Sequence, residues 1–403
     1  MHYKIKDDII WRNELDSFMF LHPETKKLLF FPRKISENIS QCWIIKESFW
    51  MNEDFIKYMI WENLAIEEHL ALPEWIIFWA KSSISWPLNA TLQITNVCNL
   101  RCMHCHRKEK WNIQMDLDAL YRLIDGLRDM RVFNLNISWW EPIMYPHLFE
   151  VIGYWFKKWL KVTMSSNLIL MNEKIAKRLA ELWLKNMHIS LDSCIPEAHD
   201  AIRALRWSFG KMTDNLKFLK DNLIEFTFVT TLVNQGIQEY SDTIDFAFNA
   251  WASAHKTNLL VPQWEWKSLE VWYYNDKSVF EEIVKVFKSK RKEYAWRMNV
   301  LWETMFQVCM ANDSDNEESK PDILKYSCPA WVNTICFTEI WEVLPCPFFS
   351  ENSVDNIFER PISEIWDNNP ILKKMRENRN DNWCKARAYS ESWDMHSKDP
   401  YSI

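Results

Sequence analysis

Hydrophobic and polar positions change their spacing repeatedly along this 403-residue chain. Between residues 89 and 262, short apolar or β-branched runs alternate with stretches whose apolar residues recur about every 3.6 positions, as in amphipathic helices. The runs are ATLQIT, LNIS, KVTMSS, NMHISLD, FTFVTT and TNLLVP. The helices are predicted over residues 116–130, 147–158, 172–184, 211–222 and 238–249. Such alternation predicts an α/β fold, a parallel sheet or partial (β/α)6 barrel with functional residues at the carboxyl ends of its strands.

The first 85 residues have a different pattern. Two apolar runs, SFMFLH and KLLFFP, flank the turn sequence PETK and predict a β-hairpin. Helical spacing follows near residues 35–49 and 52–70. These elements predict a small N-terminal α+β module, similar to a winged helix, over residues 1–85. A core over residues 86–270 and a third region over residues 271–403 complete the expected organisation.

Composition limits the classes of function. The net charge of −7 gives no basic footprint, which argues against nucleic-acid binding. No N-terminal apolar run follows a basic segment, and no stretch approaches the roughly 20 apolar residues of a membrane span. A cytoplasmic protein without a membrane partner is therefore expected. In that reducing compartment, the ten cysteines are expected to be metal ligands, catalytic groups or core residues rather than disulfides.

The glycine and tryptophan counts are both abnormal. Ordinary usage of about 7% would give roughly 28 glycines in a chain of this length, but the chain has 4 Gly and 25 Trp. Because the two counts together come close to the expected glycine number, we hypothesise that most tryptophans are native glycines, written as Trp where UGA codons were translated under the wrong genetic code. The alternative is a protein that is genuinely rich in tryptophan.

Sequence context separates the two kinds of tryptophan. Residues at turns, helix ends or motif positions are the expected glycines. They are Trp86, Trp111, Trp139, Trp140, Trp159, Trp183, Trp207, Trp251, Trp264, Trp266, Trp331, Trp341, Trp383 and Trp393. Trp366 lies on an apolar helix face in ISEIWDNNP and is expected to be a genuine tryptophan.

A cysteine cluster follows the first strand of the βα pattern. In ITNVCNLRCMHCHR, Cys98, Cys102 and Cys105 have the spacing C-x3-C-x2-C. Three thiolates on one short loop can bind three irons of a 4Fe-4S cube and leave the fourth iron open to another ligand. A zinc ion, the alternative, would need a fourth ligand nearby, which His104 or His106 could supply.

This segment resembles the CxxxCxΦC signature of the radical SAM superfamily, with His104 at the position that is usually aromatic. The resemblance implies a partial (β/α)6 barrel and an enzyme whose 4Fe-4S cluster binds S-adenosylmethionine (SAM). Reductive cleavage of SAM then gives a 5′-deoxyadenosyl radical that abstracts a substrate hydrogen. It also implies that Cys98, Cys102 and Cys105 are metal-binding and catalytic residues, and that flavodoxin or ferredoxin supplies the electron.

Further motifs follow at the ends of the later strands, in the order that the family has them. ISWWEP resembles the family's GGEP motif if both tryptophans are glycines, and SSNL resembles Thr-Asn-Gly, although Leu168 replaces the last glycine. ISLDS and HDAIRALRWSFGKM resemble segments that contact the ribose and carboxylate of SAM, with Arg203 as the carboxylate partner. The cofactor-binding residues implied are His104, Trp139, Trp140, Glu141, Pro142, Ser166, Asn167, Ser190, Asp192 and Arg203.

The third region carries late cysteines. NWCKARAYSESWDMHSKDP resembles the closing motif CGGCRARAYxxxGDxxxxDP of the SPASM/twitch extension, which holds auxiliary iron-sulfur clusters. Asp381 replaces the first cysteine of that motif, and other late cysteines of a two-cluster domain are missing. The resemblance therefore implies one auxiliary cluster, with Cys328, Cys346 and Cys384 as metal ligands.

The remaining thiols leave alternatives open. The fourth ligand of the auxiliary cluster could be Cys336, Cys309, Asp381 or the substrate. Burial in a small hydrophobic core is the alternative for all the late cysteines, and it is favoured for Cys336 and Cys309. Cys42 and Cys194 are expected to be buried or incidental thiols.

The N-terminal sequence bears on the substrate. DDIIWRNELDSFMFLHPETKKLLFF is weakly similar to peptide-recognition modules that bind leader peptides by strand addition; an extension that only packs on the barrel is the alternative. We therefore expect a radical SAM enzyme that modifies a peptide or peptide-derived substrate. The C-terminal motif also resembles maturases of haem-like tetrapyrroles. If Trp139 and Trp140 are literal, a catalytically inactive iron-sulfur protein is the alternative from another class.

Overall fold

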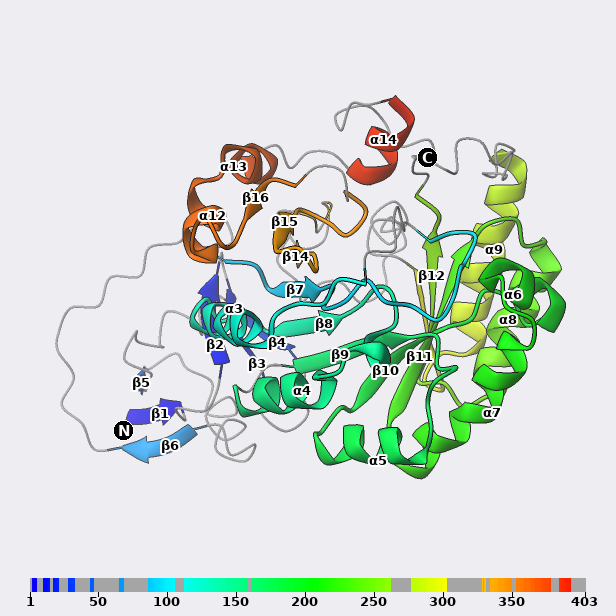
Figure 1. Cartoon of the computed structure of the whole chain (residues 1–403), viewed down its shortest axis with the longest axis horizontal. Helices are drawn as coiled ribbons and strands as arrows, with labels where there is room; N and C mark the ends of the chain where they lie inside the picture. Colours follow the sequence, from blue (N-terminus) through cyan, green and yellow to red (C-terminus); the bar gives the residue numbers. More distant parts are fainter. Residues whose placement is uncertain are drawn as a thin grey trace.

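The computed structural model describes residues 86–105, 112–158, 161–261, 277–302, 328, 330, 334–349, 353–377 and 384–392, and six short strands before residue 86 (Figure 1). Within these residues, no helix is long and apolar enough to cross a membrane. The largest sheet has ten strands in the order β13-β12-β11-β10-β9-β8-β7-β14-β15-β16.

Six parallel strands form the centre of this sheet. They are β7 (Asn89–Leu92), β8 (Asn134–Ile137), β9 (Lys161–Ser166), β10 (Asn186–Ser190), β11 (Glu225–Leu232) and β12 (Ala254–Leu259). All six strands were predicted, which confirms the α/β class. The last one begins three residues before the predicted run, because its polar positions Lys256 and Asn258 break the apolar pattern although the backbone pairs with β11.

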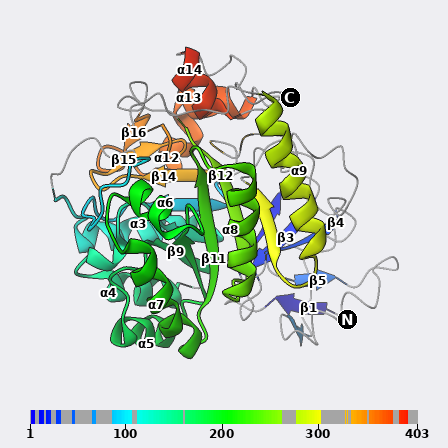
Figure 2. The ribbon, with the colours of Figure 1, turned by 90° about the vertical axis from the view of Figure 1, so that its right-hand side faces the viewer.

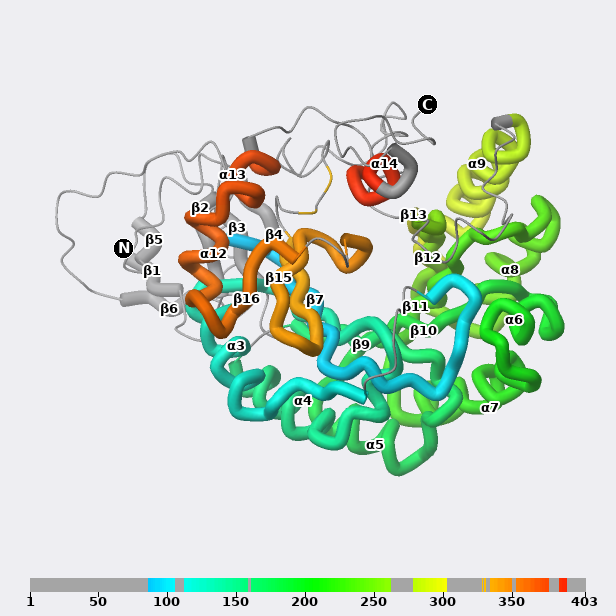
Figure 3. The backbone as a smooth tube through the Cα atoms, turned by 45° about the horizontal axis from the view of Figure 1, so that its top comes forward, coloured from blue at the N-terminus to red at the C-terminus, as the bar shows by residue number. Residues whose placement is uncertain are grey.

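Helices cover one side of the sheet (Figures 2 and 3). The five predicted helices are present as α3 (Leu117–Asp129), α4 (Leu148–Lys157), α5 (Glu173–Glu181), α7 (Ser208–Asp221) and α8 (Ile237–Asn249). Sequence reasoning missed α6 (Pro196–Arg203), α9 (Lys277–Glu293) and the parallel strand β13 (Asn299–Trp302). Apolar side chains join the layers, as in the edge-to-face contact of Phe287 with Trp302 at 4.9 Å.

The opposite side of the strands is polar, and we call it the inner face. Its cross-strand pairs are hydrogen bonds between amides and hydroxyls: Asn134 with Asn89 at 2.7 Å, Thr163 with Asn136 at 3.1 Å, and Ser138 with Ser165 at 3.1 Å. On the same strands, Leu92, Ile137 and Met164 lie in register with one another, and all three are fully buried in the hydrophobic core. Because side chains alternate across a strand, one face packs on helices and the other lines the hollow of the curved sheet.

The C-terminal part extends the sheet beyond β7. β14 (Thr334–Phe337) pairs parallel to β7, while β15 (Glu342–Leu344) and β16 (Asp355–Asn356) continue antiparallel. The helices that follow are α12 (Ile362–Asn368), α13 (Pro370–Glu377) and α14 (Lys385–Ser392). Trp366 of α12 is 1% exposed in the core, in agreement with its prediction as a genuine tryptophan.

The N-terminal residues form two small antiparallel sheets. β2 (Ile10–Glu14), β3 (Ser17–Leu21) and β4 (Leu28–Pro32) make one sheet, which confirms the predicted hairpin. β1 (His2–Ile5) pairs with β5 (Ile44–Lys46) and β6 (Ala65–Glu68) in the other. The helices predicted near residues 35–49 and 52–70 are therefore wrong at β5 and β6. Backbone pairing with β1 overrides the helical spacing there, since local propensity is weak against tertiary context. The domain boundaries at residues 85 and 270 stay predictions.

Tryptophans occupy backbone conformations that favour glycine. Twelve described residues other than glycine have positive φ angles, and seven of them are tryptophans. They are Trp139, Trp140, Trp183, Trp207, Trp251, Trp296 and Trp341. None of the four glycines, all of which are described, has a positive φ. The left-handed region is strained for residues with a Cβ and open to glycine.

Two of these tryptophans end helices in the same way. After α8, Trp251 at φ 67° donates its N–H to Phe248 O at 3.0 Å, and Ala252 donates to Ala247 O at 3.1 Å. After α5, Trp183 at φ 60° donates to Ala180 O, and Leu184 donates to Leu179 O. This is the Schellman pattern, whose left-handed position is usually glycine.

The distribution separates the tryptophans as the sequence predicted, with two differences. Six of the seven described positions that were expected to be glycines have positive φ; Trp86 does not, and Trp296 was missed. Trp155, Trp302 and Trp366 are buried in the core. The other predicted positions, Trp111, Trp159, Trp264, Trp266, Trp331, Trp383 and Trp393, lie outside the described residues.

Candidate active site at the carboxyl ends of the barrel strands

The cysteine loop follows β7 and is tied to its neighbours by backbone hydrogen bonds. Asn96 is paired with Ile113 through its backbone N–H at 3.0 Å and its side-chain oxygen at 2.7 Å. Glu141 N donates to Val97 O at 3.2 Å, and Met103 N donates to Ile202 O at 2.8 Å. The loop is therefore held between the turn after β8 and the end of α6.

The thiols of Cys98, Cys102 and Cys105 form no disulfide and are half-buried. Burial, the largest effect, raises the pKa of Cys98 to about 12 in the metal-free protein. A bound cation reverses this preference, because a coordinated thiol loses its proton. Among the described residues, no three His, Cys, Asp or Glu side chains converge as ligands of one metal ion do. The thiolates of a 4Fe-4S cube bind separate irons, so three thiols on one loop fit a cluster without such convergence.

Glu141 lies at the centre of the turn after β8. Its carboxylate is fully buried and accepts hydrogen bonds from Ser166 Oγ at 2.8 Å, Asn167 N at 2.9 Å and Ile143 N at 3.2 Å. Burial raises the pKa of Glu141 to about 7, although these hydrogen bonds act in the opposite direction. Pro142 begins the short 3-10 helix η1 (Pro142–Met144) directly after it.

The turn before Glu141 has two consecutive left-handed residues, Trp139 at φ 72° and Trp140 at φ 56°. This is the backbone that a Gly-Gly pair adopts without strain. The Trp139 ring packs edge to face on Phe348 at 5.4 Å, so an indole here reaches the C-terminal cysteine region. Leu168, at the last position of the Thr-Asn-Gly-like motif, also has a positive φ of 63°.

Asn167 connects this turn to the cysteine loop. Its side-chain amide donates to Asn99 Oδ1 at 2.8 Å, while its backbone N–H binds Glu141. Asn99 follows Cys98 directly. Sequence reasoning did not select Asn99; its position between two cysteines of the loop was the available signal.

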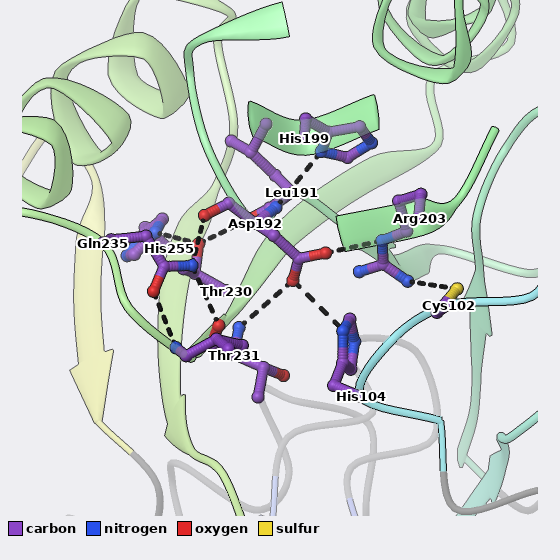
Figure 4. A network of polar contacts seen from close by, with 11 residues as sticks. Cys102, His104, Leu191, Asp192, His199, Arg203, Thr230, Thr231, Gln235 and His255 are labelled. Atoms are coloured by element: carbon purple, nitrogen blue, oxygen red, sulfur yellow. Dashed lines mark hydrogen bonds and ion pairs between the residues drawn. The ribbon is translucent and has the colours of Figure 1, made fainter. Parts of the chain in front are cut away.

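A second network surrounds Asp192, two residues after β10 (Figure 4). The fully buried carboxylate of Asp192 contacts Arg203 Nε at 2.6 Å and His104 Nε2 at 3.9 Å. Arg203 also donates from Nη1 to Cys102 Sγ at 3.7 Å. Burial acts to raise the pKa of Asp192, but the charge of Arg203, together with smaller effects of His104, His199 and the hydrogen bond from Arg203, lowers that pKa on balance. Burial lowers the pKa of His104 to about 4, so its imidazole is neutral near pH 7.

The predicted site residues thus gather in two groups. Glu141, Ser166 and Asn167 meet through hydrogen bonds, and Asp192, Arg203, His104 and Cys102 form the second network. Ser190 ends β10 two residues before Asp192, and none of the hydrogen bonds described for these networks involves it. Sequence reasoning missed His199 and Gln235, which both bind the Asp192 backbone. Asp192 N donates to His199 Nδ1 at 3.3 Å, and Gln235 Nε2 donates to Asp192 O at 2.8 Å.

The C-terminal cysteines lie near one another. Burial raises the pKa of Cys346 well above its ordinary value, and the negative charges of Cys328, Cys384 and Cys336 add to the shift. Cys328, Cys336 and Cys384 are buried, and Cys346 is half-buried. Cys336 points to the inner face, where its Sγ accepts from Gln93 Nε2 at 3.8 Å. Cys309, Asp381 and Cys42 lie outside the described residues, and Cys194 is half-buried beside α8, as its prediction as an incidental thiol allows.

The segment that carries the site matches a known protein family. Residues 92–247 match the model of the Radical SAM superfamily, a range that contains both networks and the cysteine loop. The chain therefore contains a radical SAM domain over these residues. It is an enzyme whose cofactors are a 4Fe-4S cluster and SAM, and it resembles family members with a SPASM/twitch-type C-terminal extension.

Relatives differ in the substrates that their names give. The AdoMet-dependent heme synthase of Methanosarcina barkeri is 24% identical over 343 residues, 79% of this chain and 95% of that protein. The subtilosin biosynthesis protein AlbA of Bacillus subtilis is 25% identical over 323 residues, 78% of this chain and 66% of AlbA. Streptococcus suis SuiB, solved with its precursor peptide SuiA, has the same fold, with a TM-score of 0.73 at 14% identity over 98% of each chain.

Proposed function

We propose that this radical SAM enzyme modifies a peptide. The observation that carries the proposal is the polar inner face, where amide and hydroxyl side chains of neighbouring strands form hydrogen bonds with one another. A peptide brings a backbone N–H and C=O at each residue, and such groups need hydrogen-bond partners when they leave water. The relationship to AlbA and the fold shared with SuiB, which is solved with a precursor peptide, support this choice.

The site residues have separate roles in this proposal. Cys98, Cys102 and Cys105 hold three irons of the cluster and leave one iron for SAM. When bound, these cofactors supply the electron transfer and hydrogen abstraction of the reaction, while the protein binds, orients and excludes water. Glu141 and the backbone after β8 bind the amino group of SAM.

The remaining predicted residues hold Glu141 or contact other groups of SAM. Ser166 and Asn167 hold the Glu141 carboxylate in place, as their hydrogen bonds indicate. Ser190, Asp192 and His104 lie on the ribose side, and Arg203 on the carboxylate side. We further propose that the competent turn has glycines at positions 139 and 140, since both backbones are left-handed there.

Cys328, Cys346 and Cys384 are proposed to hold one auxiliary cluster. The proposal is supported by the pKa of Cys346, which the nearby thiols of Cys328 and Cys384 help to raise. Cys336 adds to the same pKa shift and also contacts Gln93 on the inner face. It is therefore a candidate for the fourth ligand among the residues that the structure describes.

A second candidate function is the maturation of a haem-like tetrapyrrole. The observation in its favour is the relationship to heme synthase over 79% of the chain. Both functions share the radical SAM chemistry and differ in the molecule that enters the barrel.

One experiment separates the two functions. The reconstituted enzyme is incubated anaerobically with SAM, a reductant and either a small peptide encoded beside its gene or iron-coproporphyrin, and products are analysed by mass spectrometry. Loss of hydrogen from the peptide, in step with 5′-deoxyadenosine formation, is expected. A modified porphyrin together with an unchanged peptide would refute the peptide proposal.

A further inference from the structure

Arg203 lies between an acidic side chain and a thiol of the cysteine loop (Figure 4). Its Nε contacts Asp192 Oδ2 at 2.6 Å, and its Nη1 donates to Cys102 Sγ at 3.7 Å. The side chains of Arg203 and Asp192 are only 9% and 0% exposed. The guanidinium is thus a buried positive charge that touches a sulfur of the predicted cluster site.

The surrounding backbone holds this guanidinium in place. Arg203 is the last residue of α6, and the preceding Ile202 O accepts the Met103 N–H at 2.8 Å, so the same helix turn docks on the cysteine loop. Asp192 is fixed from the other side, because its Oδ1 accepts the Thr231 N–H at 3.4 Å. Strand β11, through Thr231, and the end of helix α6 therefore hold the guanidinium next to Cys102.

A positive charge at this place favours the reduced form of a cluster. Reduction adds one negative charge to the cluster and its thiolates, and a neighbouring cation stabilises the more negative state. Hydrogen bonds to cluster sulfurs and the net charge around them are recognised determinants of cluster potential. The effect is strong here because the pair is shielded from water. In the protein interior the effective dielectric constant is lower, so a charge acts more strongly on its neighbours.

We propose that Arg203 raises the reduction potential of the SAM-binding cluster through its contact with Cys102 Sγ, and that Asp192 is the positioning residue that aims it. This role is separate from the SAM carboxylate contact that the sequence resemblance implies. It rests on the assignment of Cys102 as a cluster ligand. Arg203 then acts on the cluster before SAM binds.

The test measures the midpoint potential of the cluster in the full chain without SAM, by an EPR-monitored redox titration. Arg203→Gln removes the charge. We expect the reduction equilibrium to become at least tenfold less favourable, a shift of about 59 mV to lower potential for one electron. Arg206→Gln is the matched control. It removes the same charge three residues later from an exposed side chain, and the potential should stay unchanged.

Two further variants keep the test decisive if Arg203→Gln leaves Asp192 unpaired and the protein fails to fold. Arg203→Lys keeps the charge. Its equilibrium constant for reduction should stay within a few-fold of the wild-type value. The double variant Asp192→Asn/Arg203→Gln replaces the ion pair with neutral amides and should lower the potential.

SAM binding distinguishes the two roles of Arg203. If the potential of Arg203→Gln, or of the double variant, equals that of wild type while SAM affinity falls, Arg203 acts on SAM alone and the proposal is wrong. If neither wild type nor any variant binds an iron-sulfur cluster through Cys98, Cys102 and Cys105, the assignment of Cys102 as a cluster ligand is wrong instead.

Discussion

Replacing Trp251 with glycine is predicted to stabilise the protein, although a large side chain is lost. Trp251 has a φ of 67° at the left-handed position after α8, and its side chain is 83% exposed. A residue with a Cβ pays roughly 1–2 kcal/mol in this conformation, whereas glycine loses about 0.5–1 kcal/mol more backbone entropy on folding. The exposed indole buries little apolar surface that could offset the strain.

The net gain for Trp251→Gly is therefore about 0–1.5 kcal/mol, with a midpoint of about 0.75 kcal/mol. In a domain of this size, about 1 kcal/mol corresponds to a melting temperature rise of roughly 2–4 °C. Thermal unfolding followed by circular dichroism, with wild type measured in parallel, detects such a rise. Both Schellman hydrogen bonds remain available, because they use backbone atoms only.

Two variants serve as controls for this reasoning. Leu223→Gly changes the same cap position after α7, where φ is 55°, and should also stabilise. Trp366→Gly removes a tryptophan that is 1% exposed in α12 and should cost about 3–5 kcal/mol. If Trp251→Gly lowers the melting temperature as Trp366→Gly does, the left-handed backbone does not call for glycine and the recoding hypothesis loses its structural support.

The remaining predictions concern the site. Because the pKa of Glu141 is raised to about 7, its protonated form stabilises the cofactor-free fold at low pH. Wild type should lose stability relative to Glu141→Gln as pH rises from about 4.5 to 7, which melting curves across that range would show; equal pH profiles would contradict it. Asn99→Ala should lower SAM-cleavage activity about tenfold, whereas Asn99→Asp keeps the acceptor for Asn167 and most of the activity; equal loss in both would refute this. Cys384→Ser should remove the iron of the auxiliary cluster and spare that of the Cys98 loop, as iron analysis with Mössbauer spectroscopy would show.

The fold was largely predictable because its strands and helices have strong periodicity. The six barrel strands and five of the helices follow from it. α6 was missed because it has only eight residues and overlaps the motif HDAIRALRWSFGKM, which was interpreted for its resemblance to a SAM-contacting segment and not for its secondary structure. β5 and β6 were mistaken for helices, since short strands in small sheets take their conformation from backbone partners far away in sequence.

The candidate site was predictable where motif residues sit at strand ends, because parallel strands bring their carboxyl ends together. Glu141, Ser166 and Asn167 meet for this reason. Which side chains pair was not predictable. The contact of Arg203 with Asp192 and Cys102 depends on how α6 docks on the cysteine loop. The Asn99–Asn167 hydrogen bond depends on the register of β9 against β8 and of β8 against β7.

The central claim is that this chain cleaves SAM at a cluster bound by Cys98, Cys102 and Cys105. The most direct measurement quantifies 5′-deoxyadenosine after the Trp139→Gly/Trp140→Gly protein is reconstituted anaerobically and incubated with SAM and dithionite. We predict that 5′-deoxyadenosine forms with this protein and is absent when the three cysteines are changed to alanine. A double-glycine protein that holds its cluster and releases no 5′-deoxyadenosine would contradict the claim.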